Sequence, residues 1–147
     1  SVVDALPPGG LLAVVADHGM VSVDAADIVD VDATPVLLDG VEDVGGEPRA
    51  RHIYFARGAV EIVLSTWRET LKGRAWVVTR EEAIEAGWFG EPVSDDARRR
   101  IGDVVAAARG SAAVVRRQVE PLESSLIGHH GSLTNAEQSV PLLLSHR

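Results

Sequence analysis

An uninterrupted run of six small or branched apolar residues, from Leu11 to Ala16, constrains the fold most. The run follows Pro7-Pro8-Gly9-Gly10, a sequence at which a helix would end, and it is short for a helix. Such a run is typical of a central strand that is covered on both faces in an α/β sheet. We therefore expect a buried strand over residues 11–16 that ends in Asp17, His18 and Gly19.

The residues directly after this expected strand are candidate metal ligands. Open α/β sheets bind ligands just beyond the carboxyl ends of their strands. Aspartate and histidine both bind metals, and histidine is the commonest ligand of zinc-like ions. Gly19 lets the backbone turn away, which leaves the side chains of Asp17 and His18 at the rim of the sheet. Because Asp-His-Gly is also an ordinary turn sequence, a purely structural role stays open as an alternative.

The composition is that of a globular domain and excludes several kinds of site. None of the 147 residues is a cysteine, which excludes disulfides, thiolate metal sites and a cysteine nucleophile. A formal net charge of −8 argues against a nucleic-acid groove or a membrane surface as partner. No apolar run approaches the ~20 residues of a membrane span. With no cysteine and no targeting segment in the sequence, a cytoplasmic location is favoured.

The middle of the chain has the alternating pattern of an α/β unit. We expect, in order, a hairpin of strands 41–44 and 50–55, a helix over 58–72, a strand over 75–79, a helix over 80–86, and a second hairpin of strands 103–108 and 112–116. Thr79 with Glu82, and later Thr134 with Glu137, have capping-box spacing, and each pair predicts the start of a short helix.

Histidines in loops provide further candidate ligands. The chain has five histidines, and the pair His129-His130 lies in a glycine-flanked sequence, as His18 does. An apolar run over 140–144 follows this pair, and Pro141 within it indicates an edge strand. An aspartate with two histidines and no cysteine is typical of a divalent-metal site in a hydrolase. His52 lies in an expected strand, and we expect it to be a packing group.

Two short elements carry a family resemblance. Ala16-Asp17-His18-Gly19-Met20 resembles the metal-binding Asp-His-Gly-Met element of the alkaline phosphatase superfamily. Gly128-His129-His130-Gly131 is similar to the Gly-x-His-Gly element of its type I phosphodiesterase/nucleotide pyrophosphatase branch, and the order of the elements and the long insert between them also match. The resemblance implies an α/β fold with a partial alkaline-phosphatase-like sheet. Residues 1–20 and 127–147 would be pieces of the core catalytic domain, and residues 21–126 an inserted cap-like α/β subdomain.

The resemblance also implies a phosphoric ester hydrolase with two divalent metal ions, usually zinc. Asp17 and His18 match the pair that binds the ion activating a threonine or serine nucleophile. His130 matches the ligand of the second ion, which activates water in the hydrolysis step. The implied substrate is a small phosphate ester or a nucleotide. Two ions clamp the attacking and leaving oxygens and offset the charge that develops between them.

Three further residues are candidate substrate contacts. His129 occupies the variable position of the Gly-x-His-Gly element. Trp88 and Phe89 lie in an expected loop, where aromatic faces can stack on a nucleotide base. The two aromatic side chains are equally suited to anchoring that loop to the core, because they bury a large apolar area.

The family pattern is incomplete in this chain. The family places its nucleophile and three further metal ligands before the Asp-His-Gly element, whereas residues 1–16 hold only Ser1 and Asp4 as candidates. We therefore expect a C-terminal portion of a longer enzyme, beginning in a helix tail over residues 1–6, whose partner is the missing N-terminal half of the same protein. This portion should contain no catalytic nucleophile, be inactive by itself and bind metal weakly or not at all. The alternatives are a non-catalytic α/β binding or interaction module, or a phosphomutase or sulfatase relative in the same superfamily.

Overall fold

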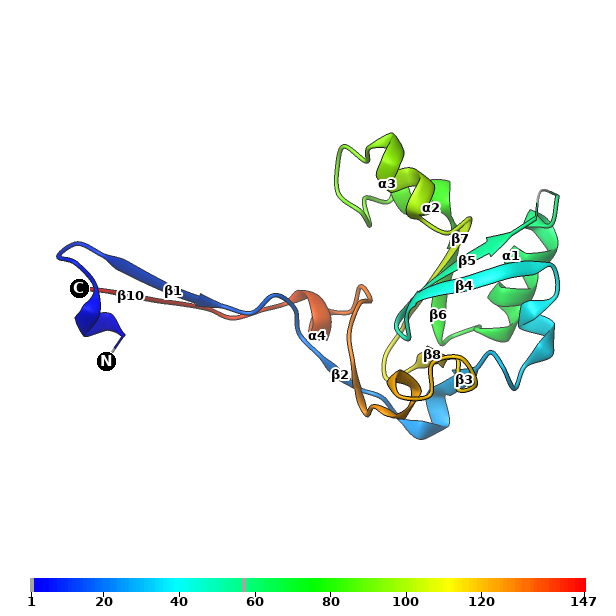
Figure 1. The fold of residues 1–147 in the computed structure, drawn as a ribbon, viewed down its shortest axis with the longest axis horizontal. Coiled ribbons are helices and arrows are strands. Elements are labelled where there is room, and N and C mark those ends of the chain that lie inside the picture. The colour runs from blue at the N-terminus through cyan, green and yellow to red at the C-terminus, as the bar shows by residue number, and fades with distance from the viewer. Residues whose placement is uncertain (1, 57) are drawn as a thin grey trace.

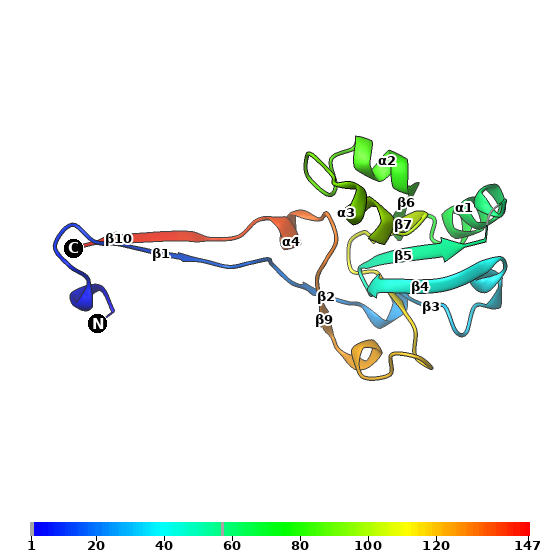
Figure 2. The same ribbon diagram turned by 45° about the horizontal axis from the view of Figure 1, so that its top comes forward.

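The computed structural model describes residues 2–56 and 58–147 as a compact α/β body from which a long two-stranded arm extends (Figure 1). Both chain termini lie at the far end of the arm (Figures 1 and 2). Ser1, at the start of the expected helix tail, lies outside the described residues. The rest of that tail is a single turn of 3₁₀ helix, η1 (Val3–Ala5).

A four-stranded antiparallel sheet in the order β4-β5-β7-β6 forms the centre of the body. Its strands are β4 (Val41–Glu47), β5 (Ala50–Phe55), β6 (Ala75–Thr79) and β7 (Val104–Ala108). The predicted hairpin of β4 and β5 is confirmed, but it turns at Pro48-Arg49, because Gly45 and Gly46 pair with His52 and Arg51 within the ladder. All residues of β7 are buried, as expected for a strand with neighbours on both edges.

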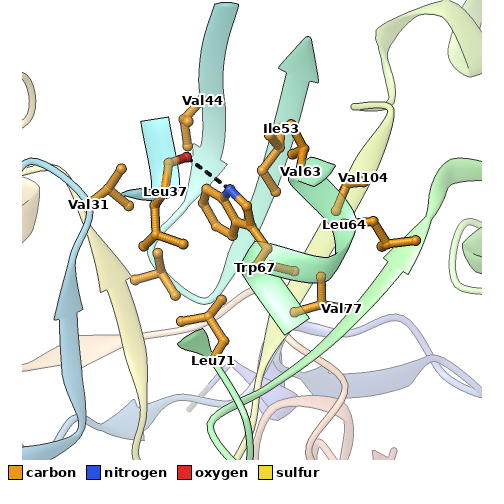
Figure 3. Packing of buried hydrophobic residues seen from close by; sticks show 12 residues of the cluster. Val31, Leu37, Val44, Ile53, Val63, Leu64, Trp67, Leu71, Val77 and Val104 are labelled. Carbon is orange, nitrogen blue, oxygen red and sulfur yellow. Dashed lines mark hydrogen bonds between the residues drawn. The ribbon is translucent and has the colours of Figure 1, made fainter. Parts of the chain in front are cut away.

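Helices cover both faces of this sheet. On one face lies α1 (Val60–Thr70), which confirms the helix predicted over 58–72. Trp67 of α1 is fully buried among Ile53, Val77 and other apolar side chains, and its indole N–H donates a 3.0 Å hydrogen bond to the carbonyl of Leu37 (Figure 3). On the other face lie α2 (Arg80–Glu85), which begins in the predicted Thr79–Glu82 capping box, and α3 (Asp95–Arg100).

The predicted second hairpin is wrong. Both of its strands exist, but β8 (Ala113–Val115) pairs in parallel with β3 (Ile28–Asp30), and β7 pairs with β5 and β6. The two edges of β7 are already occupied, so no edge is left for β8. The remaining elements of the body are β2 (Val21–Ser22), η2 (Ala25–Asp27), η3 (Pro35–Leu38), η4 (Glu123–Ser125), β9 (Gly128–His129) and α4 (Asn135–Gln138).

The arm consists of β1 (Leu11–Val15) paired antiparallel with β10 (Leu142–His146). The strand predicted over 11–16 is therefore present, but its predicted burial is wrong for this chain: Leu11 is 62 % exposed and Leu143, on β10, is 64 % exposed. The reason is that β10 is the only strand paired with β1 among the described residues, and neither strand contributes a side chain to the buried clusters of the body. The C-terminal strand begins two residues later than predicted, after Pro141. No helix among the described residues is long and apolar enough to cross a bilayer.

Candidate metal centre

The pairing of β2 with β9 brings together two segments that are far apart in the sequence. Val21 pairs with His129 and Ser22 with Gly128, and the ladder continues with a 2.8 Å bond from the Val23 N–H to the Ile127 carbonyl. In an antiparallel pair, the residues that precede one strand lie beside the residues that follow the other. The segment before β2, which contains His18, is therefore brought next to His130.

The structure brings the three predicted ligand residues to one place. The imidazole rings of His18 and His130 are stacked, with their centroids 3.6 Å apart and their planes 16° from parallel. Asp17 Oδ2 lies 3.7 Å from His18 Nε2, and Asp17 Oδ1 accepts a 3.0 Å hydrogen bond from the His18 backbone N–H. Their role as metal ligands stays a prediction.

Local hydrogen bonds set the chemical state of Asp17 and His18. His18 Nδ1 lies 2.8 Å from the carbonyl oxygen of Gly19, which can only accept, so Nδ1 carries a proton and Nε2 is the nitrogen that can bind a metal when it is unprotonated. Hydrogen bonds from the backbone N–H groups of His18 and of Asp17 itself, with help from the nearby His18 ring, lower the pKa of Asp17. An anionic carboxylate next to an unprotonated imidazole nitrogen is a donor set that suits zinc and similar ions.

As metal ligands, these donors would supply only part of a site. Within residues 2–56 and 58–147, no group of three or more histidine, aspartate or glutamate side chains is placed to hold one ion. Zinc takes four protein ligands in structural sites and usually three in catalytic ones. Asp17 and His18 offer two donors for one ion and His130 one donor for another, so each ion would need further ligands.

Close contact with α4 fixes the turn that carries Asp17 and His18. The Gly19 N–H donates a 2.8 Å hydrogen bond to the Glu137 carbonyl. A Cβ atom at position 19 would lie 1.9 Å from the Ala136 carbonyl oxygen, which is far inside van der Waals contact. Only glycine fits here, because its backbone must touch the backbone of α4.

A buried ion pair that the sequence did not predict lies beside these segments. Arg49, in the β4–β5 turn, donates from Nε and Nη2 to the two carboxylate oxygens of Glu137, at 2.6 and 2.7 Å. Both side chains are almost completely buried. The capping box predicted at Thr134 is not formed, because the Thr134 hydroxyl does not cap the helix but donates to the Glu137 carboxylate. The one signal in the sequence is a glutamate in the family-like stretch that follows His130.

Two of the three candidate substrate contacts are packed against the body. The His129 ring is buried, and its Nε2 donates a 3.0 Å hydrogen bond to the Leu126 carbonyl. Trp88 packs against the apolar cluster beneath α2 and α3. Phe89 is partly exposed and makes an edge contact with the His52 ring, with the ring centroids 6.0 Å apart. A role of these residues in substrate binding stays a prediction.

His52 is a packing group, as expected. Its Nδ1 accepts a 3.0 Å hydrogen bond from the backbone N–H of Gly102. Burial lowers its pKa, and the positive charge of Arg80 lowers it further. The ring therefore stays neutral and serves as an acceptor inside the body.

Comparison with known proteins identifies the family. Residues 2–133 match the family model described as type I phosphodiesterase / nucleotide pyrophosphatase. The chain belongs to this family. It is thus a member of the alkaline phosphatase superfamily, as its two short elements indicate. A search of the curated proteins gave no significant match.

Solved structures of related enzymes share the fold. Mouse ectonucleotide pyrophosphatase/phosphodiesterase 5 matches with a TM-score of 0.70 at 18% identity over 92% of this chain and 33% of that chain. An inactive form of the mouse protein in complex with AMP gives a TM-score of 0.69 at 18% identity, with the same coverage. Phosphonoacetate hydrolase from Sinorhizobium meliloti, in complex with phosphonoformate, gives 0.66 at 22% identity over 94% of this chain and 36% of that chain. The chain thus spans about a third of the length of these structures and has a partial alkaline-phosphatase-like α/β fold.

Proposed function

We propose that this chain forms part of a metal-dependent phosphodiesterase or nucleotide pyrophosphatase and supplies Asp17, His18 and His130 to the hydrolytic site. The observation that carries the proposal is the stack of the His18 and His130 rings. The stack joins the two elements that resemble metal-binding elements of the family to which the chain belongs. If the two elements were unrelated turn sequences, nothing would require their histidine rings to lie together.

Each of the three residues has a distinct task in this proposal. The Asp17 carboxylate and His18 Nε2 would hold one divalent ion, and His130 would hold a second ion. Zinc is the ion that this donor set favours. The Gly19 carbonyl orients the His18 ring and keeps its Nε2 lone pair available. When both ions are bound, they would polarise the phosphate ester and activate the attacking group.

The substrate in this proposal is a small phosphate ester or a nucleotide. The mouse relative binds AMP in its inactive form, and the bacterial relative binds phosphonoformate. Both ligands are compact anions that carry a phosphorus-centred group. In this chain Phe89, Trp88 and His129 are the candidate contacts to the remainder of such a substrate.

Activity would require the residues that this chain lacks. The proposed nucleophile and the remaining metal ligands have no counterpart among residues 1–16, and the related structures are about three times as long as this chain. We propose that these groups come from an N-terminal part of the same protein. The chain alone would then be inactive.

The test is a metal-dependence assay on the longer protein and on this chain alone. The longer protein should hydrolyse bis(p-nitrophenyl) phosphate, lose that activity with EDTA and regain it with zinc. Asp17→Asn or His130→Gln should each lower kcat/KM by more than roughly 100-fold, because loss of a ligand costs more than loss of a residue that only orients a ligand. His146→Gln, at the end of the arm, is the matched histidine control and should have no effect.

Two results would overturn the proposal. Full activity of the Asp17→Asn and His130→Gln variants would remove these residues from the site. Zinc-dependent turnover by the 147-residue chain alone would show that no further part of the protein is needed.

A further inference from the structure

We infer that Glu137 is a positioning residue that holds His130 against His18, and that Arg49 of the β4–β5 turn keeps Glu137 in place for this task. The catalytic consequence of this inference rests on the proposed function. The geometric part does not, because it concerns how this chain holds two of its own imidazole rings together.

Glu137 contacts both of the segments that carry these histidines. Its carboxylate Oε1 accepts a 3.0 Å hydrogen bond from the backbone N–H of Ser132, two residues after His130. Its backbone carbonyl accepts a 2.8 Å hydrogen bond from the Gly19 N–H, one residue after His18. Glu137 therefore connects the segment before β2 to the segment after β9, on the side where the rings stack.

Arg49 holds the Glu137 carboxylate in a single orientation. Arg49 is 0 % exposed and Glu137 is 2 % exposed, and the guanidinium binds both carboxylate oxygens. The remaining guanidinium nitrogen, Nη1, donates to the carbonyls of Gly110 and Ala112, at 3.0 and 2.6 Å. With donors directed at fixed backbone carbonyls, the guanidinium cannot rotate without losing hydrogen bonds.

The loop between His130 and Glu137 is docked on the same part of the body. The Ser132 side chain is fully buried, and its hydroxyl donates a 2.5 Å hydrogen bond to the Ala108 carbonyl at the end of β7. The Gln138 amide donates a 2.8 Å hydrogen bond to the Ser132 carbonyl. The central sheet thus sets the position of His130 through Arg49, Glu137 and Ser132.

A contribution to the free energy of unfolding does not by itself explain the buried Arg49–Glu137 ion pair. A buried ion pair often contributes no more to the free energy of unfolding than apolar side chains of the same size, because both charges must be desolvated. A buried ion pair can, however, select one geometry over others. Here the geometry that it selects is the contact between the two histidine segments.

A second ion pair in the body, between a buried arginine and a partly exposed glutamate, provides a control. Arg51, two residues after Arg49, is also 0 % exposed and donates to both carboxylate oxygens of Glu120, at 3.2 and 2.6 Å. The other hydrogen bonds of Glu120 are to the backbone of Arg116 and Ser124, away from the histidine segments. Glu120→Gln therefore weakens a second arginine–glutamate ion pair, with a more exposed carboxylate, without touching the residues next to His18 or His130.

The experiment compares Glu137→Gln with Glu120→Gln in the isotope-labelled, metal-free chain by NMR. In the wild-type chain we expect NOEs between the ring protons of His18 and His130 and slow hydrogen exchange of the Gly19 amide. Glu137→Gln should weaken the NOEs and speed exchange at Gly19 by at least about fivefold, the effect of a weakened hydrogen bond. Glu120→Gln should leave both readouts unchanged.

A milder variant covers the case in which Glu137→Gln does not fold. Thr134→Val removes one hydrogen bond to the Glu137 carboxylate and leaves the ion pair in place. It should speed Gly19 exchange in the same direction. Unchanged NOEs and exchange in the folded Glu137 or Thr134 variant would overturn the inference, as would equal effects of Glu120→Gln.

Activity of the longer protein separates this inference from the proposed function. Glu137→Gln should lower kcat by roughly 10- to 100-fold, as loss of a group that orients a ligand does, with Glu120→Gln near wild type. If the NMR changes occur but the wild-type longer protein hydrolyses no phosphate ester, the positioning role stands and the proposed function fails. If the longer protein is active and Glu137→Gln leaves kcat unchanged, the catalytic consequence is overturned.

Discussion

Two histidines in this chain use Nδ1 in opposite ways, one as a hydrogen-bond donor and one as an acceptor. His18 donates from Nδ1 to the Gly19 carbonyl, which leaves Nε2 facing the Asp17 carboxylate. His52 accepts through Nδ1 from the Gly102 N–H, so its proton is on Nε2. One ring is held against a carboxylate near the surface, and the other completes a backbone hydrogen bond inside the body.

His52 makes the stability of the chain depend on pH. Burial, followed by the charge of Arg80, lowers its pKa below the unfolded value of about 6.5. The unfolded state therefore binds the proton more readily, so the contribution of His52 is fully present above that pH and is lost as the pH falls through the folded pKa. His52→Asn keeps an acceptor but cannot titrate. We expect its urea-unfolding free energy to fall less than that of wild type between pH 7.5 and 5.5, and equal losses would contradict this.

The sequence predicted the convergence of Asp17, His18 and His130 because each lies in a glycine-flanked turn next to an apolar strand. It did not predict the pairing of Arg49 with Glu137. Arg49 lies in Gly45-Gly46-Glu47-Pro48-Arg49, a stretch whose composition is typical of an exposed turn. Burial of that arginine depends on a carboxylate far along the chain, and no local pattern encodes such a partner.

At the scale of elements, two similar apolar runs have opposite surroundings. Residues 104–108 form the fully buried strand β7, whereas residues 11–15 form the exposed strand β1. Both runs predict a strand, but the burial of a strand depends on the strands at its edges and the helices over its faces. β7 has strands on both edges and helices over both faces, whereas β1 pairs with β10 alone in the part of the chain that the structure describes. The element types were therefore predictable from local sequence, and the pairing of β8 with β3 was not.

The contact between the Gly19 turn and α4 tolerates no side chain. Gly19→Ala would force a Cβ to within 1.9 Å of the Ala136 carbonyl, so the turn and α4 must move apart. We expect a loss of unfolding free energy of about 1–3 kcal/mol, as for other overpacked sites. The measurement is urea unfolding, with loss of the His18–His130 NOEs as a second readout.

Gly45→Ala is the control for this substitution. A Cβ there would lie 3.6 Å from the Tyr54 ring, an ordinary contact. A Gly19→Ala variant as stable as Gly45→Ala would contradict this, because α4 would then move aside with no loss of unfolding free energy.

At the scale of the whole molecule, the body has a complete core and the arm has none. The arm exposes six large apolar side chains, on both of its strands: Leu11, Val14, Val15, Leu142, Leu143 and Leu144. So many exposed apolar side chains on one short ribbon are typical of a surface that another part of a protein covers. In the longer protein, we propose that this surface is covered by the part from which the missing ligands come.

The exposed arm should make the isolated chain self-associate. Replacing Val14 and Leu143, which are paired across the ribbon, by threonine keeps β propensity and removes apolar surface. We expect sedimentation velocity to show concentration-dependent oligomers for wild type and mainly monomer for the double variant. Ile62→Thr, an equally exposed apolar position on α1, should leave association unchanged. A wild-type chain that stays monomeric at high concentration would contradict the expectation.

The path of the chain through the arm has a further consequence. The chain enters the body through β1 and leaves it through β10, and the Gly9 and Arg147 N–H groups bond across to Arg147 and Gly10 at the far end. Entry and exit are thus about 5 Å apart, the spacing of paired strands. The segment between Val15 and Leu142 therefore begins and ends at paired residues of the arm. Because its two ends lie on paired residues, a two-residue turn is expected to join Val15 to Leu142 with the strands kept in register.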